Sequence, residues 1–161
     1  MVVSFIGHRD IEDRGGVYKK IRAVMRELIV CRAAEVFLFG SRSDFDSLCV
    51  KAAKELKSEF PQIKRIYIRA EYPVISDSYR EYRLEDYDDT FFPESLQGAG
   101  KAVYVERNKL MIDSADVCVF YCDMHAAMET VSGTRLAFRY ALSKHKQVIN
   151  LFDTRSINSV M

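Results

Sequence analysis

The chain has 161 residues, of which 48% are hydrophobic and 29% are charged, and these values fit one folded domain with a buried core. Its 24 lysines and arginines nearly balance 23 aspartates and glutamates, so the net charge of +1 gives no electrostatic argument for a nucleic acid or an acidic membrane as partner. No apolar run is long enough to span a bilayer, and residues 1–8 lack the pattern of a signal peptide, so we expect a cytoplasmic protein without a membrane partner.

Strands and helices are predicted to alternate in the first part of the chain. Three short runs of β-branched and aromatic residues predict buried strands: Val2–Ile6, Glu35–Phe39 and Ile63–Arg69. Apolar residues recur at helical spacing between these runs, which predicts helices over Val17–Cys31 and Asp44–Phe60. Pro61 ends the second helix, because proline interrupts helical hydrogen bonding.

Residues 71–100 show no clear period and contain Pro73, Pro93, Gly98 and Gly100. We therefore expect an irregular, acidic and aromatic insertion, which in a compact domain is usually functional or mobile. Its aromatic side chains can stack on a base or ribose from a lid, or they can form a small second core or a subunit contact. These side chains are Tyr72, Tyr79, Tyr82, Tyr87, Phe91 and Phe92.

The alternation resumes after the insertion. Helices are predicted over Val103–Ala115 and Arg135–Lys144, and strands over Val117–Tyr121 and Gln147–Phe152. Alternating elements predict one domain over residues 1–161, with a Rossmann-like, mostly parallel sheet and helices on both faces in three α/β/α layers. In such a sheet, ligands bind past the carboxyl ends of the strands, so the loops that follow the strands are the candidate site.

Two of these loops share a design. Gly7-His8-Arg9-Asp10 and Gly40-Ser41-Arg42-Ser43-Asp44 each place a glycine at the end of a strand and polar side chains after it. Glycine lets the backbone approach a ligand closely, and arginine can bind a phosphate through two nitrogens. The alternative is that both are ordinary turns, with Asp44 as the cap of the following helix. Neither loop matches the G-x-x-x-x-G-K-[ST] or G-x-G-x-x-G phosphate-binding patterns.

Ser132-Gly133-Thr134 lies between a predicted strand and a predicted helix. Free backbone N–H groups at a helix N-terminus, together with a threonine hydroxyl, can bind a phosphate. The same tripeptide is also an ordinary helix cap. The position of four other polar loops on the same predicted edge of the sheet favours the phosphate-binding interpretation.

The remaining polar candidates lie on a helix and on the first loop. Glu106-Arg107-Asn108-Lys109 can direct an arginine to the same edge, although a charged run on a helix is usually its solvent-exposed face. His8 can act as an acid or a base near neutral pH, or it can be a hydrogen-bonded turn residue. Cys118 and Cys122 are expected to pack as small apolar residues, and we expect neither a metal site nor a structural disulfide.

Five segments, taken together, resemble the SLOG superfamily. They are Phe5–Arg9, Phe39–Asp46, Glu106–Met111, Ser114–Phe120, and Ser132–Thr134 with Tyr140 and Ala141. This superfamily is Rossmann-like and includes the Lonely Guy phosphoribohydrolases and the DNA-processing protein A fold, and the chain is most similar to its small stand-alone members. The similarity covers nearly the whole chain.

The resemblance implies a nucleotide or nucleotide-derived ligand and a homodimer. The ligand-binding residues that it implies, together with neighbouring polar residues of the same loops, are Gly7, His8, Arg9, Gly40, Ser41, Arg42, Asp44, Arg107, Asn108, Ser132, Gly133 and Thr134. In the Lonely Guy enzymes, a catalytic glutamate follows the Gly-Thr turn by three residues, whereas this chain has Ala137. Arg107 matches the catalytic arginine of those enzymes, and the candidates for a replacement carboxylate are Glu106 and Glu129.

The missing glutamate favours a binding or sensing module that holds a nucleotide signal or an ADP-ribose derivative without efficient turnover. The alternative is an N-glycosidase or phosphoribohydrolase that acts on a nucleoside monophosphate, with Arg107 and Glu106 as catalytic residues. Nucleic-acid binding fits worst, because no basic stripe accompanies the aromatic residues. We expect no cofactor.

Overall fold

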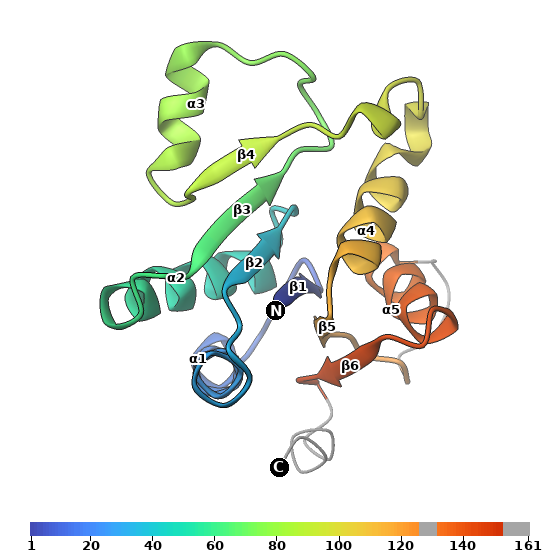
Figure 1. Cartoon of the computed structure of the whole chain (residues 1–161). Helices are drawn as coiled ribbons and strands as arrows, with labels where there is room; N and C mark the ends of the chain where they lie inside the picture. The colour runs from blue at the N-terminus through green and yellow to red at the C-terminus, as the bar shows by residue number, and fades with distance from the viewer. Residues whose placement is uncertain (126–131, 153–161) are drawn as a thin grey trace.

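A six-stranded, all-parallel sheet forms the centre of the computed structural model, which describes residues 1–125 and 132–152 (Figure 1). The strand order is β4-β3-β2-β1-β5-β6. The strands are β1 (Val2–Gly7), β2 (Val36–Phe39), β3 (Lys64–Ile68), β4 (Asp89–Phe91), β5 (Val117–Tyr121) and β6 (Gln147–Asn150). Strands β2 to β4 lie on one side of β1, and β5 and β6 lie on the other. The connections from β1 and β5 therefore leave in opposite directions between these two strands, as at the ligand sites of open α/β sheets.

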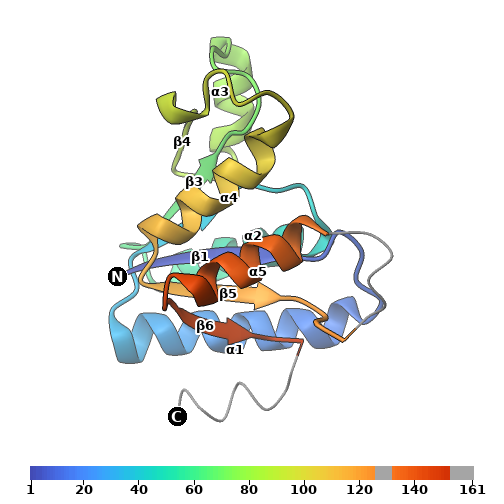
Figure 2. The ribbon, with the colours of Figure 1, turned by 90° about the vertical axis from the view of Figure 1, so that its right-hand side faces the viewer.

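Helices cover both faces of the sheet (Figures 1 and 2). They are α1 (Arg14–Arg32), α2 (Asp44–Glu59), α3 (Asp77–Leu84), α4 (Val103–Ser114) and α5 (Gly133–Ser143), with short 3₁₀ turns at Glu94–Leu96 and Gly100–Ala102. Helices α1 and α2 pack together on one face, and α4 and α5 pack together on the other. The predicted three-layer, Rossmann-like α/β fold is confirmed. Within the described ranges, no helix has the length and apolar character needed to cross a bilayer.

The core consists of two apolar layers, one on each side of the sheet. Because side chains alternate along a strand, Phe5 and Phe37 pack under α1 and α2, while Ile6 and Leu38 pack under α4 and α5. Cys118 and Cys122 are buried in the second layer as free thiols, so their predicted apolar packing is confirmed. Strands that are buried on both faces explain the continuous apolar runs in the sequence.

Residues 71–100 are more regular than the sequence indicates, because they contain α3 and β4. Helix α3 has no buried residue, so it lacks the apolar period by which helices are recognised. It begins at Ser76, whose hydroxyl accepts a hydrogen bond from the N–H of Tyr79 at 3.2 Å. Strand β4 has only three residues and is held by pairing with β3 and by an Arg65–Asp88 ion pair at 3.1 Å.

The first helix also begins earlier than predicted. Asp13 accepts a hydrogen bond from the N–H of Gly16 at 3.0 Å, and this cap starts α1 at Arg14 although the first turn is polar. The last strand ends at Asn150, whose side-chain amide and carbonyl bond the backbone of Cys122. Polar caps, rather than apolar spacing, therefore set these boundaries.

Candidate functional site

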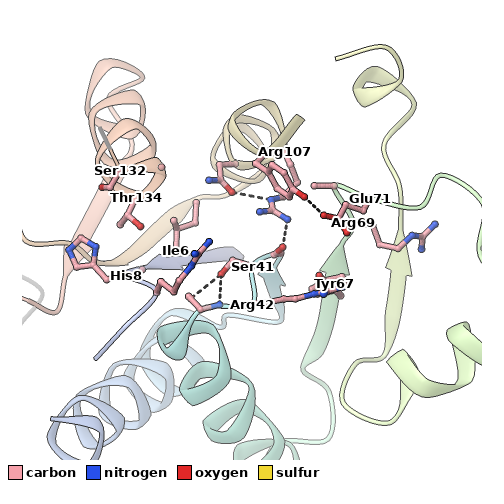
Figure 3. A pocket seen from close by; sticks show the side chains of 18 of the residues that line it. Ile6, His8, Ser41, Arg42, Tyr67, Arg69, Glu71, Arg107, Ser132 and Thr134 are labelled. Atoms are coloured by element: carbon pink, nitrogen blue, oxygen red, sulfur yellow. Dashed lines mark hydrogen bonds between the residues drawn. The ribbon is translucent and has the colours of Figure 1, made fainter. Parts of the chain in front are cut away.

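A cavity of about 790 Å³ lies past the carboxyl ends of β1, β2 and β3, where the N-termini of α2 and α5 and one face of α4 meet (Figure 3). This is large enough for a nucleotide-sized ligand. Every ligand-binding residue predicted from the sequence lines it except Asp44. The lining residues from that set are Gly7, His8, Arg9, Gly40, Ser41, Arg42, Arg107, Asn108, Ser132, Gly133 and Thr134.

The N-terminus of α5 closes one end of the cavity, where Figure 3 shows Ser132 and Thr134 near His8. Ser132 caps the helix, because its hydroxyl accepts a hydrogen bond from the N–H of Arg135 at 3.1 Å. The cap hydroxyl is thus engaged within the protein. Gly133 and Thr134 contribute the first helical N–H groups and a hydroxyl to the lining, which suits an anionic group.

His8 joins the loop after β1 to the loop after β5. Its Nε2 accepts a hydrogen bond from the backbone N–H of Asp123 at 2.6 Å, so the imidazole is neutral with its proton on Nδ1. Partial burial lowers the pKa of His8, and the charge of Asp123 opposes this shift while that of Arg135 reinforces it. The geometry favours a hydrogen-bonded turn residue over an acid–base residue.

Arg107 is a buried cation in the cavity wall, with 4% of its surface exposed. From α4, its guanidinium donates hydrogen bonds to the backbone carbonyl oxygen of Gly40 and to Oδ1 of Asn108, the latter at 3.0 Å. Burial lowers the pKa of Arg107, whereas nearby tyrosines and carboxylates raise it. The guanidinium is fixed by the protein itself and presents a positive charge to any ligand in the cavity.

The two strand-end glycines make room for packing. A Cβ atom on Gly7 would lie 2.3 Å from the ring of Phe45, and one on Gly40 would lie 2.8 Å from Cδ of Arg107. Gly7 thus makes room for the first aromatic residue of α2, and Gly40 makes room for the buried arginine. Both glycines also line the cavity, so the predicted close approach of a ligand to their backbone stays a prediction.

Two predicted polar site residues, Asp44 and Glu106, lie outside the cavity lining. Asp44 lies outside the lining, since its carboxylate accepts a hydrogen bond from the N–H of Ile11 at 3.1 Å and pairs with Arg14 at 2.8 Å. It is not the cap of α2 either, because Ser43 fills that position and bonds the N–H of Asp46 at 3.0 Å.

Glu106 also lies outside the lining and pairs with Lys109 at 3.3 Å on the surface of α4. Glu129 lies outside the described residues. Ala137 is buried in the apolar layer under α4 and α5, so this position supplies no carboxylate to the cavity.

Four lining residues at the opposite end of the cavity were not predicted from the sequence. Tyr67 lies near the end of β3, Arg69 and Glu71 follow that strand, and Tyr104 lies on α4. The hydroxyl of Tyr104 donates a hydrogen bond to Oε1 of Glu71. Arg69 is buried and donates to Oγ1 of Thr90 at 3.2 Å. The strand-end rule could have identified the first three, since they lie at or just past the carboxyl end of a predicted strand.

The aromatic residues of the insertion divide between several environments. Tyr72 and Tyr79 line the cavity, with ring centroids 5.7 Å apart. Tyr87 is buried against Tyr67 in the apolar layer under α1 and α2, so it belongs to the main core and not to a small second one. Tyr82 lines a second hollow between α2 and α3, and Arg83 stacks over the ring of Tyr67 at 4.2 Å. Phe91 is partly exposed on β4.

Asp46 is a buried carboxylate behind the loop that follows β2. Only 3% of its surface is exposed, and its Oδ1 has no hydrogen-bond partner among the described residues. Burial raises the pKa of Asp46 to about 7, although the charge of Arg107 and the amides of Ser41 and Gly40 favour the ionised form. The sequence pattern gave no sign of this residue, because an aspartate in the first turn of a helix is ordinarily exposed.

No protein-family model matches the chain, and no curated protein matches it. The function is therefore inferred from the chemistry of the cavity. Its described lining contains four arginines, Arg9, Arg42, Arg69 and Arg107, against two carboxylates, Asp10 and Glu71. Such a local excess of cations within a nearly neutral protein makes the cavity electrostatically suited to a small anion.

Proposed function

We propose that this protein binds a nucleotide or a nucleotide-derived ligand, such as a nucleotide signal or an ADP-ribose derivative, as a binding or sensing module. One observation carries the proposal: the cavity combines the N-terminus of α5 with an excess of arginines and with tyrosine side chains. Helix N-termini and arginines suit phosphates, and tyrosine rings suit a base. The SLOG resemblance, which implies the same ligand class, and a homodimer belong to this proposal.

The binding module is favoured over an enzyme because the catalytic position of the similar enzymes is filled by the buried methyl group of Ala137. A second candidate, N-glycosidic hydrolysis of a nucleoside monophosphate, has one supporting observation. Arg107 and the carboxylate of Glu71 line the same cavity, and oxocarbenium-like chemistry needs a carboxylate near the sugar. Neither Glu106 nor Ala137 supplies that group.

The test is to identify what copurifies with the protein. Native mass spectrometry is expected to show the chain with a bound nucleotide and to report the oligomeric state. Chromatography of a denatured extract should then recover that nucleotide intact. Arg42→Gln, in the cavity, should reduce the bound fraction, while Arg32→Gln, at the end of α1, should not.

Two results would count against this function. Recovery of free base after incubation with a nucleotide would favour the hydrolase. An empty protein whose melting temperature no nucleotide raises would contradict nucleotide binding altogether.

A further inference from the structure

We propose that the cavity selects a nucleobase with two adjacent N–H donors, as in guanine, through the carboxylate of Glu71. This inference rests on nucleotide binding by the same cavity. The part of the cavity concerned is called the Glu71 end and comprises Glu71, Tyr72, Tyr79 and Tyr104.

The Glu71 end differs chemically from the rest of the cavity. An ionised carboxylate only accepts hydrogen bonds, so it repels a phosphate and requires donors on the ligand. No ion pair joins Glu71 to a cation of the described residues, and its recorded partner is the hydroxyl of Tyr104, which bonds Oε1. The phosphate of a bound nucleotide is therefore directed to the other end, at Ser132–Thr134, which Figure 3 shows across the cavity from Glu71.

Exposed rings at the Glu71 end favour a base over a sugar. Tyr72 and Tyr104 are 51% and 49% exposed, and both line the cavity, so part of each ring is accessible for stacking. Arg107 lies 6.0 Å from the centroid of the Tyr104 ring, which leaves the opposite face of that ring for a base. A nucleobase has an aromatic face that stacks on such rings, whereas a ribose has none. Tyr72 has a positive φ of 58°, which is uncommon for a bulky residue, and such backbone conformations cluster at ligand sites.

The order of hydrogen-bonding groups favours guanine among the bases. Guanine presents a carbonyl oxygen, N1–H and an amino group side by side, and two parallel donors match one carboxylate. Adenine instead presents a ring nitrogen beside its amino group. That nitrogen is an acceptor, so its lone pair would face a lone pair of the Glu71 carboxylate. Arg42 supplies a donor for the guanine carbonyl, because it also lines the cavity and lies close enough for Tyr67 and, less strongly, Glu71 to raise its pKa.

Calorimetric titration with GDP, IDP and ADP tests this selection. The wild-type protein should bind GDP at least about tenfold more tightly than ADP, since a hydrogen bond to a charged group contributes about that factor or more. IDP, which lacks the amino group, should fall between them. Glu71→Gln should weaken GDP binding and bring the GDP-to-ADP ratio close to one. Glu35→Gln, the same change beyond the amino end of β2, should leave the ratio unchanged.

The outcomes separate this inference from the proposed function. Equal affinities for GDP and ADP would overturn the base selection while leaving nucleotide binding intact. If wild type and Glu71→Gln bound 2′,3′-dideoxy-GDP equally well, the carboxylate would be shown to bind the ribose hydroxyls and not the base. That result would also overturn the base selection. If none of the three nucleotides bound, the base selection would fail, while the copurification test would still decide nucleotide binding separately. Because Glu71 is exposed, an unchanged melting temperature of the Glu71→Gln protein is expected and verifies folding.

Discussion

The guanidinium of Arg107 donates a hydrogen bond to the backbone carbonyl oxygen of Gly40, and so joins α4 to the end of β2 across the cavity wall. The arginine fits only because residue 40 has no side chain: a Cβ atom there would lie 2.8 Å from Cδ of Arg107 and 2.9 Å from Sδ of Met111. The buried charge of the site is thus positioned by a backbone atom of a neighbouring strand, and its position depends on a glycine that is distant in sequence.

Gly40→Ala is expected to displace Arg107 and to damage both folding and binding. Overpacking of a filled interior costs about 1–3 kcal/mol, so the free energy of unfolding in urea should fall by that amount. The affinity for the copurifying nucleotide should fall as well. Gly15→Ala is the matched control, because a Cβ there meets nothing within 4 Å in the first turn of α1. It should be neutral or slightly stabilising, and an equal loss in both variants would contradict the packing argument.

The sequence predicted the sheet and most of the cavity because both follow from short-range patterns. Buried parallel strands are continuous apolar runs, and the strand-end rule then identifies loops such as Gly7–Arg9 without knowledge of contacts. The pattern failed where structure depends on partners that are remote in sequence. Helix α3 buries nothing, so no periodicity marks it.

Side-chain roles were less predictable than their location. Asp44 pairs with Arg14, which lies on another helix and is distant in sequence, whereas Glu106 pairs with Lys109 one turn further along α4. In neither case does the composition show that the carboxylate bonds a protein partner and not a ligand. Asp46 shows the reverse case. It is buried beside the loop after β2 and Arg107, and nothing in its own segment indicates that burial.

The imidazole of His8 is expected to titrate below its ordinary pKa of 6.5. Burial disfavours its charged form, and protonation of Nε2 would break the hydrogen bond from Asp123. The contribution to stability therefore increases as pH rises through the folded pKa towards 6.5, because the unfolded chain binds the proton first. NMR titration of the ring should show the tautomer protonated on Nδ1 at neutral pH. A titration above 6.5, absent in His8→Asn, would contradict this assignment.

Two substitutions at the N-terminus of α5 should distinguish its helix-capping residue from its ligand-binding residue. Ser132→Ala removes the hydroxyl that caps α5 by accepting the N–H of Arg135, so the free energy of unfolding should fall by about 1 kcal/mol. Thr134→Val preserves shape and the cap, so it should leave the melting temperature nearly unchanged while it weakens nucleotide binding measured by calorimetry. Ser143→Ala, at the other end of the helix, should change neither quantity by more than a few tenths of a kcal/mol. Unaltered affinity in Thr134→Val would exclude its hydroxyl from the binding site.

The buried carboxylate of Asp46 should give the protein an unusual dependence of stability on pH. Burial raises its pKa to about 7, so between about pH 4 and about pH 7 the folded state holds a proton that the unfolded state has lost. Stability from this group therefore falls as pH rises across that window. Asp46→Asn should remove this slope. The decrease in the free energy of unfolding between about pH 5 and about pH 8 should be larger in the wild type than in the variant, by on the order of 3 kcal/mol.

Asp88 provides the opposite case in the same protein. Although burial opposes its ionisation, hydrogen bonds from Arg65 and Lys57 lower the pKa of Asp88 to about 2. Its contribution to the free energy of unfolding is therefore present above about pH 4 and is lost as pH falls towards 2. Asp88→Asn should destabilise the protein at neutral pH by about 2 kcal/mol, whereas Asp46→Asn should stabilise it there. Urea unfolding of both variants at about pH 5 and about pH 8 distinguishes the two signs. A destabilised Asp46→Asn protein at about pH 8 would mean that the ionised carboxylate is needed to hold Arg107 and the loop after β2 in place.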